Sequence, residues 1–192
     1  MEYSTDHTFL EKLKQKDVLA CKQLYLQYAD AMYNLCIRIL QHQAEAEDAL
    51  QEAFIKIFNN IHQYRNESSI GSWMKQIVTN TCLDVLKKKK IAFDELKEDM
   101  NESESESDSD SDSDNDNDSE SENNFTIEEI KKAIEELPHG YRVVFNLFMF
   151  EDYSHKQIAD MLEISESTAK TQLFKAKRKL KELLTAKKRQ HG

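Results

Sequence analysis

The sequence contains little glycine or proline and few cysteines. Three Gly and one Pro in 192 residues leave little material for tight turns and favour an all-α fold. The three cysteines (Cys21, Cys36 and Cys82) are odd in number, widely spaced and without a Cys-x-x-Cys pair, so we expect reduced thiols and no zinc or redox site. No apolar run approaches the ~20 residues that span a bilayer, and the N-terminus lacks the basic-then-apolar pattern of a secretion signal. We therefore expect a cytoplasmic, all-helical protein with no membrane insertion, no metal and no cofactor.

The formal net charge of −10 is concentrated in the middle of the chain. Residues 1–93 carry 12 basic and 11 acidic side chains, residues 125–192 carry 13 and 10, and residues 94–124 carry 1 and 15. The middle segment contains the run SESESDSDSDSDNDNDSESE, which has no apolar side chain to offset the entropy of ordering a backbone. The sequence therefore predicts two small helical bundle domains, 1–93 and 125–192, joined by a disordered acidic linker.

Two helices joined by a tight turn are predicted between Ser154 and Leu180. Ser154 and Gln157 have the spacing of a capping box, in which two side chains satisfy the free N–H groups of a helix start. Ser165 can cap the second helix, and Glu166 then lies in the first turn, where the helix dipole favours negative charge. This arrangement is typical of a helix-turn-helix.

One face of the second helix has the composition of a DNA-binding surface. It lies opposite the apolar side and carries small, polar and basic residues. Small side chains let a helix enter a major groove, while hydroxyl and basic groups can meet base edges and phosphates. The alternative is an amphipathic surface helix with a solvated basic face. The predicted DNA-binding residues of this motif are Ser165, Ser167, Thr168, Lys170, Thr171, Phe174, Lys175 and Arg178.

Further helices are predicted from apolar spacing and capping residues. In the N-terminal part, Asp17 can cap a helix that ends near Leu40, a second helix covers 46–61, and Ser72 can cap a third. The outward face of the second helix shows Asp48, Gln51, Glu52 and Ile55, which is polar except for one aliphatic side chain.

In the C-terminal part, Thr126 and Glu129 form a second capping-box pattern. Residues 141–150 are nearly all apolar, so periodicity alone does not distinguish a helix from a buried strand. Because no partner strand is predicted elsewhere, we expect a helix there.

Two blocks of the chain together resemble a known family. The first contains LKQKDVLACKQLYLQYADAMYNLCIRIL and AEAEDALQEAFIKIFNNIHQYRNESSIGSWMKQIVTNTCLDVLKKKK, and it resembles the promoter-melting domain of bacterial sigma factors of the extracytoplasmic-function (ECF) group. The second contains ELPHGYRVVFNLFMFEDYSHKQIADMLEISESTAKTQLFKAKRKL and is similar to the C-terminal domain of the same group. The blocks occur in the family's order and cover nearly all of the chain outside the acidic segment.

The resemblance implies a transcription initiation subunit that binds core RNA polymerase and promoter DNA and is sometimes held by an anti-sigma factor. A subunit of this kind is expected to contribute no catalytic side chain. By that resemblance, the helix-turn-helix reads the minus-thirty-five element, and the polymerase-binding residues are Asp48, Gln51, Glu52 and Ile55. Unpaired bases of the minus-ten element would be accepted by Asn66, Ser68, Ser69 and Trp73, and the adjacent backbone would be held by Lys75, Lys87 and Lys88. Trp73 also lies on an apolar stripe, and a core position is the more ordinary expectation for it.

Three features depart from the family's pattern. Glu163 stands in the turn where Gly is usual, and a non-Gly residue in the left-handed region costs ~1 kcal/mol. Ser167 replaces a frequent Gly at the start of the reading helix. The acidic segment is the third departure, and we hypothesise that it mimics nucleic acid and weakens DNA binding of the free protein by competing for the basic helices.

Two other functions are compatible with parts of the sequence. A stand-alone helix-turn-helix regulator would bind DNA as a dimer without polymerase, which leaves the N-terminal block unexplained. A helical protein-interaction adaptor would not depend on Lys170, Thr171 or Lys175. An enzyme is not expected, because the sequence shows no nucleophile and base pairing and no phosphate-cradling glycine loop.

Overall fold

Every regular secondary-structure element among the described residues is a helix, as the sequence predicts. The computed structural model describes residues 7–89 and 125–190, and the segment for which an acidic linker is predicted lies outside them. The chain divides into two compact units, Met1–Lys89 and Lys90–Gly192. Each unit is described by itself.

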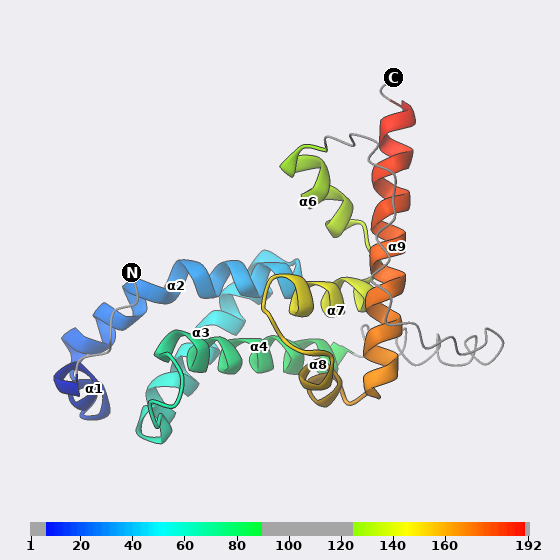
Figure 1. Ribbon diagram of the computed structural model, residues 1–192. Coiled ribbons are helices and arrows are strands. Elements are labelled where there is room, and N and C mark those ends of the chain that lie inside the picture. Colours follow the sequence, from blue (N-terminus) through cyan, green and yellow to red (C-terminus); the bar gives the residue numbers. More distant parts are fainter. Residues whose placement is uncertain (1–6, 90–124, 191–192) are drawn as a thin grey trace. The chain divides into compact units, whose positions relative to one another are not determined.

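The first unit is built from three long helices around one core (Figure 1). Its elements are α1 (His7–Lys14), α2 (Val18–Leu40), α3 (Gln43–Asn60), the short 3-10 helix η1 (Ile61–Gln63) and α4 (Ile70–Lys89). α2, α3 and α4 each contact the other two. Leu24 and Leu35 of α2, Ile57 of α3 and Met74 of α4 are almost completely removed from solvent, so the core lies between these helices and leaves one side of each helix outside.

Helix starts in this unit follow local capping chemistry, with two corrections. α3 begins at Gln43, three residues before the predicted start, and His42 is its cap. Asp17 caps α2 as predicted, because its Oδ1 accepts a hydrogen bond from the backbone N–H of Ala20 at 2.9 Å. The predicted cap of α4 at Ser72 is wrong. α4 begins at Ile70, and Ser69 is its cap: the Ser69 Oγ accepts from the backbone N–H of Ser72 at 3.1 Å.

The second unit packs three shorter helices against one long helix (Figure 1). Its helices are α6 (Ile127–Glu135), α7 (His139–Met149), α8 (His155–Leu162) and α9 (Glu166–Gln190). The apolar segment 141–150 is thus helical, as expected. Both predicted capping boxes are confirmed, Thr126 with Glu129 at α6 and Ser154 with Gln157 at α8.

A buried arginine fixes the turn between α6 and α7. Arg142 is 8% exposed, and its Nη1 donates to the backbone oxygens of Glu135 and Leu137, both at 2.9 Å. The last carbonyls of a helix have no partner within the helix. Arg142 supplies such a partner at the end of α6 through its Nη1.

Left-handed backbone is provided by residues other than glycine. Lys16, Gln41, Asn66, Asp152 and Glu163 have φ between 53° and 60°, whereas none of the glycines in the described part has positive φ. The left-handed conformation expected at Glu163 is confirmed, with φ 58° and ψ 40°. This residue ends α8, and its geometry sets the turn into α9.

Within residues 7–89 and 125–190, no helix is both long enough and apolar enough to cross a bilayer.

Candidate nucleic-acid and protein interfaces

The first turn of α9 presents a cluster of three hydroxyl groups. Ser165 caps the helix as predicted, since its Oγ accepts from the backbone N–H of Thr168 at 3.0 Å. The same Oγ lies 2.7 Å from the Ser167 Oγ and 2.7 Å from the Thr168 Oγ1. Hydroxyl groups at a helix N-terminus can exchange these local hydrogen bonds for bonds to phosphate or base edges.

The two faces of α9 divide as the sequence predicts. Ala169, Leu173 and Ala176 are buried against the rest of the unit. On the outer side, Ser167, Lys170, Thr171, Phe174 and Arg178 are exposed, and Thr168 and Lys175 are half-buried. We call these seven residues with Ser165 the α9 outer face. Phe174 is 65% exposed, so this face combines basic and hydroxyl groups with one large apolar side chain.

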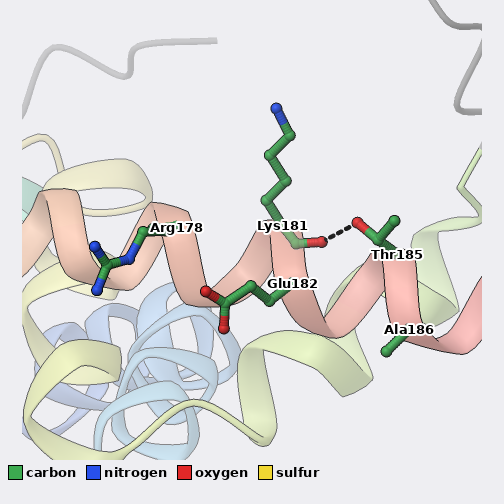
Figure 2. Close-up of a pocket in the computed structure, with 5 residues that line it drawn as sticks. All are labelled: Arg178, Lys181, Glu182, Thr185 and Ala186. Atoms are coloured by element: carbon green, nitrogen blue, oxygen red, sulfur yellow. Dashed lines mark hydrogen bonds between the residues drawn. The ribbon is translucent and has the colours of Figure 1, made fainter.

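The outer face continues as a shallow hollow along the C-terminal half of α9 (Figure 2). It has a volume of about 380 Å³, and its described lining residues are Arg178, Lys181, Glu182, Thr185 and Ala186. Thr185 Oγ1 donates to the backbone oxygen of Lys181, so this hydroxyl is turned to its own helix, whereas the Lys181 side chain extends away from it. Every described lining residue comes from α9, and the carboxylate of Glu182 lies among the two basic side chains.

In the first unit, Tyr64 holds the loop that precedes α4. It is 5% exposed, and its Oη lies 2.6 Å from the backbone oxygen of Ser68 and 3.0 Å from Asn66 Oδ1. Its ring lies 5.5 Å from that of Trp73, centroid to centroid. Burial raises the pKa of Tyr64 above its ordinary value, so the hydroxyl stays protonated and able to donate. Sequence reasoning missed this residue, although an aromatic side chain in a polar loop is a signal for it.

Tyr64 brings together three of the predicted base contacts. Asn66 and Ser68 are exposed and bond to its hydroxyl, and Trp73 is half-buried beside its ring. Trp73 is therefore only partly buried, and its ring packs beside that of Tyr64. The fourth residue, Ser69, is exposed, but its hydroxyl caps α4 and lies 2.8 Å from the Ser72 Oγ.

The outward face of α4 carries two further polar residues that are candidates for base contacts. Gln76 and Asn80 are exposed, and they follow Trp73 by about one and two helical turns, within a sector of roughly 60° at 100° per residue. Both side chains can donate to and accept from base edges. The spacing of Trp73, Gln76 and Asn80 in the sequence already indicates that they share one face of the helix.

The predicted backbone-binding lysines do not share one face. Lys75 and Lys87 are half-buried and Lys88 is exposed, and the three are separated by roughly 100° to 140° around α4. Lys88 lies close enough to Glu52 for its charge to contribute to lowering the pKa of that carboxyl. The structure thus places Lys88 beside α3 rather than beside Lys75.

The four residues predicted to bind polymerase form one exposed strip on α3. Asp48, Gln51, Glu52 and Ile55 are all exposed, and Ile55 is 61% exposed. We call this strip the α3 outer face. The Glu52 Oε1 lies 2.8 Å from the Lys56 Nζ, and this hydrogen bond is the main reason why the pKa of Glu52 is lowered. Glu52 is therefore held as a carboxylate in a defined direction.

Comparison with known proteins assigns both units. The chain matches two family models in order: Sigma-70 region 2 over residues 24–91 and Sigma-70, region 4 over residues 127–180. It is 31% identical to the RNA polymerase sigma factor SigZ of Bacillus subtilis over 148 residues, which is 74% of each chain. The chain belongs to the sigma-70 family of RNA polymerase sigma factors, and to its ECF group. The ECF RNA polymerase sigma factor SigW of Bacillus subtilis is 29% identical over 176 residues, 91% of this chain and 94% of the relative.

A solved structure supports the fold of this sigma factor. It is the sigma factor RpoE of Bartonella quintana, described in complex with the anti-sigma factor NepR. The TM-score is 0.53 at 21% identity, covering 85% of this chain and 96% of that one. A stand-alone regulator is not favoured, because the match to Sigma-70 region 2 accounts for the N-terminal block that such a regulator leaves unexplained.

Tyr64→Phe tests the positioning of the loop in this sigma factor. The phenylalanine keeps the ring beside Trp73 but removes the hydroxyl that bonds to Ser68 and Asn66. We expect three- to tenfold less transcription from a promoter that depends on its minus-ten element, because one hydrogen bond is worth about 1 kcal/mol. Transcription from matched promoters with and without a minus-ten mutation measures this. An unchanged minus-ten preference would show that the hydroxyl does not place the loop.

Proposed function

We propose that this sigma factor binds core RNA polymerase, directs it to promoters and assists DNA melting, with a separate task for each unit. Residues 1–93 dock on polymerase through the α3 outer face and capture minus-ten bases beside Trp73. Residues 125–192 read the minus-thirty-five element through the α9 outer face, and the acidic residues 94–124 connect the two. The observation that carries this proposal is the pair of exposed faces of opposite character, acidic with one aliphatic side chain on α3 and basic with hydroxyls on α9.

The mechanism uses binding energy and no catalytic side chain of this chain. Each unit binds one promoter element weakly, and polymerase fixes their separation so that the second contact becomes effectively intramolecular. Extruding a base costs a few kcal/mol, which stacking and pocket contacts in the first unit offset. Such a protein works in the cytoplasm, where polymerase and promoter DNA are found. Since the solved relative is described in complex with an anti-sigma factor, we include an antagonist of that kind among the partners.

In vitro transcription on a promoter library with core RNA polymerase tests this function. We expect RNA only when this protein and core are both present, and footprints on promoter DNA only with core. Protection of a palindrome by the protein alone would instead indicate a self-sufficient regulator. Failure of core to retain the protein would contradict the proposal.

Phe174 is expected to read a thymine in the minus-thirty-five element. An exposed phenylalanine on a helix in the major groove can contact the 5-methyl group of thymine, and Phe174 is the large apolar side chain of the α9 outer face. Phe174→Ala should lower transcription about fivefold to tenfold on a thymine-containing element. Replacing each thymine in turn by deoxyuridine, which lacks the methyl group, locates the contact. At one position this replacement should lower transcription by the wild type but leave transcription by Phe174→Ala unchanged. Additive losses at every thymine would exclude a direct contact.

A further inference from the structure

One lysine connects the α3 outer face to the helix that carries Trp73. The Lys56 Nζ lies 2.8 Å from the Glu52 Oε1 and donates to the Thr81 Oγ1 of α4 at 3.2 Å. Asp84 Oδ2, also on α4, lies farther away at 3.8 Å. Within the described part of the chain, these are the three side chains that contact this ammonium group. An ammonium has three donors and no acceptor, so Lys56 can direct one donor to Glu52 on α3 and another to Thr81 on α4, while Asp84 is a more distant charge.

The hydrogen bonds continue from Lys56 into the middle of α4. Thr81 is 1% exposed, and its Oγ1 donates to the backbone oxygen of Ile77 at 2.9 Å. Because the hydroxyl hydrogen points to Ile77, the lone pairs of Thr81 are free to accept from Lys56. The chain of bonds therefore runs in one direction, from Lys56 through Thr81 to Ile77, and Ile77 lies one turn after Trp73.

This arrangement differs from an ordinary pair on a helix surface. An exposed pair of Glu and Lys four residues apart contributes only a few tenths of a kcal/mol. Lys56 also bonds to a buried hydroxyl of a second helix, and hydrogen bonds from a charged donor in a partly dry site are stronger and more directional. The polar contacts of Lys56 thus connect Glu52 on α3 to Thr81 on α4.

We propose that Lys56 is a positioning residue that couples polymerase docking to strand opening through the Glu52, Lys56 and Thr81 chain. The inference rests on the proposed function. When α3 is docked on polymerase through Glu52 and its neighbours, Lys56 keeps α4 in place. Trp73, Gln76 and Asn80 are then already positioned to contact the extruded bases. Bases captured by a preorganised helix need less ordering at the moment of melting.

Thr81→Val removes the contact between Lys56 and α4 but keeps the contact between Lys56 and Glu52 on α3. It leaves Glu52 and Lys56 paired, so binding to core RNA polymerase should stay within about twofold of wild type. Open-complex formation on duplex promoter should fall roughly fivefold to tenfold, since one bond from a charged donor is lost. Permanganate reactivity of melted thymines measures it. A template with a pre-opened mismatched bubble should restore activity to within about twofold, which a merely structural defect would not do.

Thr79→Val is the matched control. Thr79 is 0% exposed on the same helix, and it is not among the residues that contact the Lys56 ammonium. We expect its open-complex formation to equal that of wild type on duplex and bubble templates alike. Lys56→Met should lose both core binding and opening severalfold, and Lys56→Arg, which can bond to both partners, should recover both.

The outcomes distinguish this inference from the proposed function. If wild-type protein with core opens no promoter, the proposed function fails. If wild type opens promoters but Thr81→Val opens them as well as Thr79→Val does, the coupling role is excluded. A defect of Thr81→Val that persists on the bubble template would likewise overturn it, because the loss would then lie outside the melting step.

Discussion

Ile55→Asp is expected to weaken binding of this sigma factor to core RNA polymerase by roughly 100-fold, because loss of an apolar anchor from an interface costs about 2–4 kcal/mol. Ile55 is 61% exposed and is the aliphatic member of the α3 outer face, flanked by Asp48, Gln51 and Glu52. Such an anchor inside a polar surround is typical of a binding hot spot. An aspartate there would also have to be desolvated without a partner. Fluorescence anisotropy of labelled protein titrated with core enzyme measures the effect.

Ile127→Asp provides the control for this prediction. Ile127 begins α6 in the second unit and is 68% exposed, so the same change is made at an equally accessible isoleucine outside the α3 outer face. Aspartate at a helix start is also favourable with the helix dipole. We expect core binding within about twofold of wild type. Equal losses in the two variants would show that Ile55 has no special place in the interface.

Neutralising the acidic segment is expected to raise the affinity of the free protein for DNA by roughly tenfold at low salt. Replacing the eleven acids of residues 102–122 by Ser or Asn changes the formal net charge from −10 to +1. The prediction follows from charge in the sequence, because these residues lie outside the described part of the structure. A polyanion on the same chain repels DNA and competes for the basic side chains that bind phosphates.

Two controls separate charge from length and sequence. A variant with the same Ser, Asp and Glu residues in scrambled order should bind DNA as wild type does. The gain of the neutralised variant should disappear near 1 M salt, where the screening length falls to about 3 Å. Electrophoretic mobility shifts without polymerase give the affinities. No gain at low salt would discard the hypothesis that this segment competes with DNA.

Most helices of this protein could be predicted from the sequence, whereas the start of α4 could not. Both Ser69 and Ser72 are good caps, and local chemistry does not choose between them. Ile70 is 4% exposed, so burying it in the core favours a helix that already includes it. Tertiary packing therefore decided between two locally equivalent starts.

The candidate faces were predictable where a single helix determines them. Helical periodicity separated the exposed residues of α9 and α3 from the buried ones, and it needed no knowledge of neighbouring helices. Tyr64 and Lys56 were missed because their roles depend on partners that packing brings close: the loop carbonyl of Ser68 for one, and Thr81 for the other. The three lysines of α4 were grouped by the family resemblance, and the helix places them on different sides.

The scarcity of glycine has a consequence for how stable this sigma factor can be. Asn66 and Asp152 tolerate left-handed backbone well, but Lys16, Gln41 and Glu163 each carry a penalty of up to about 1 kcal/mol. Natural domains have a margin of only about 5–15 kcal/mol. These three turns therefore lower the free energy of unfolding by a sizeable share of that margin. Replacing these residues by glycine could raise the melting temperature without changing the α3 or the α9 outer face.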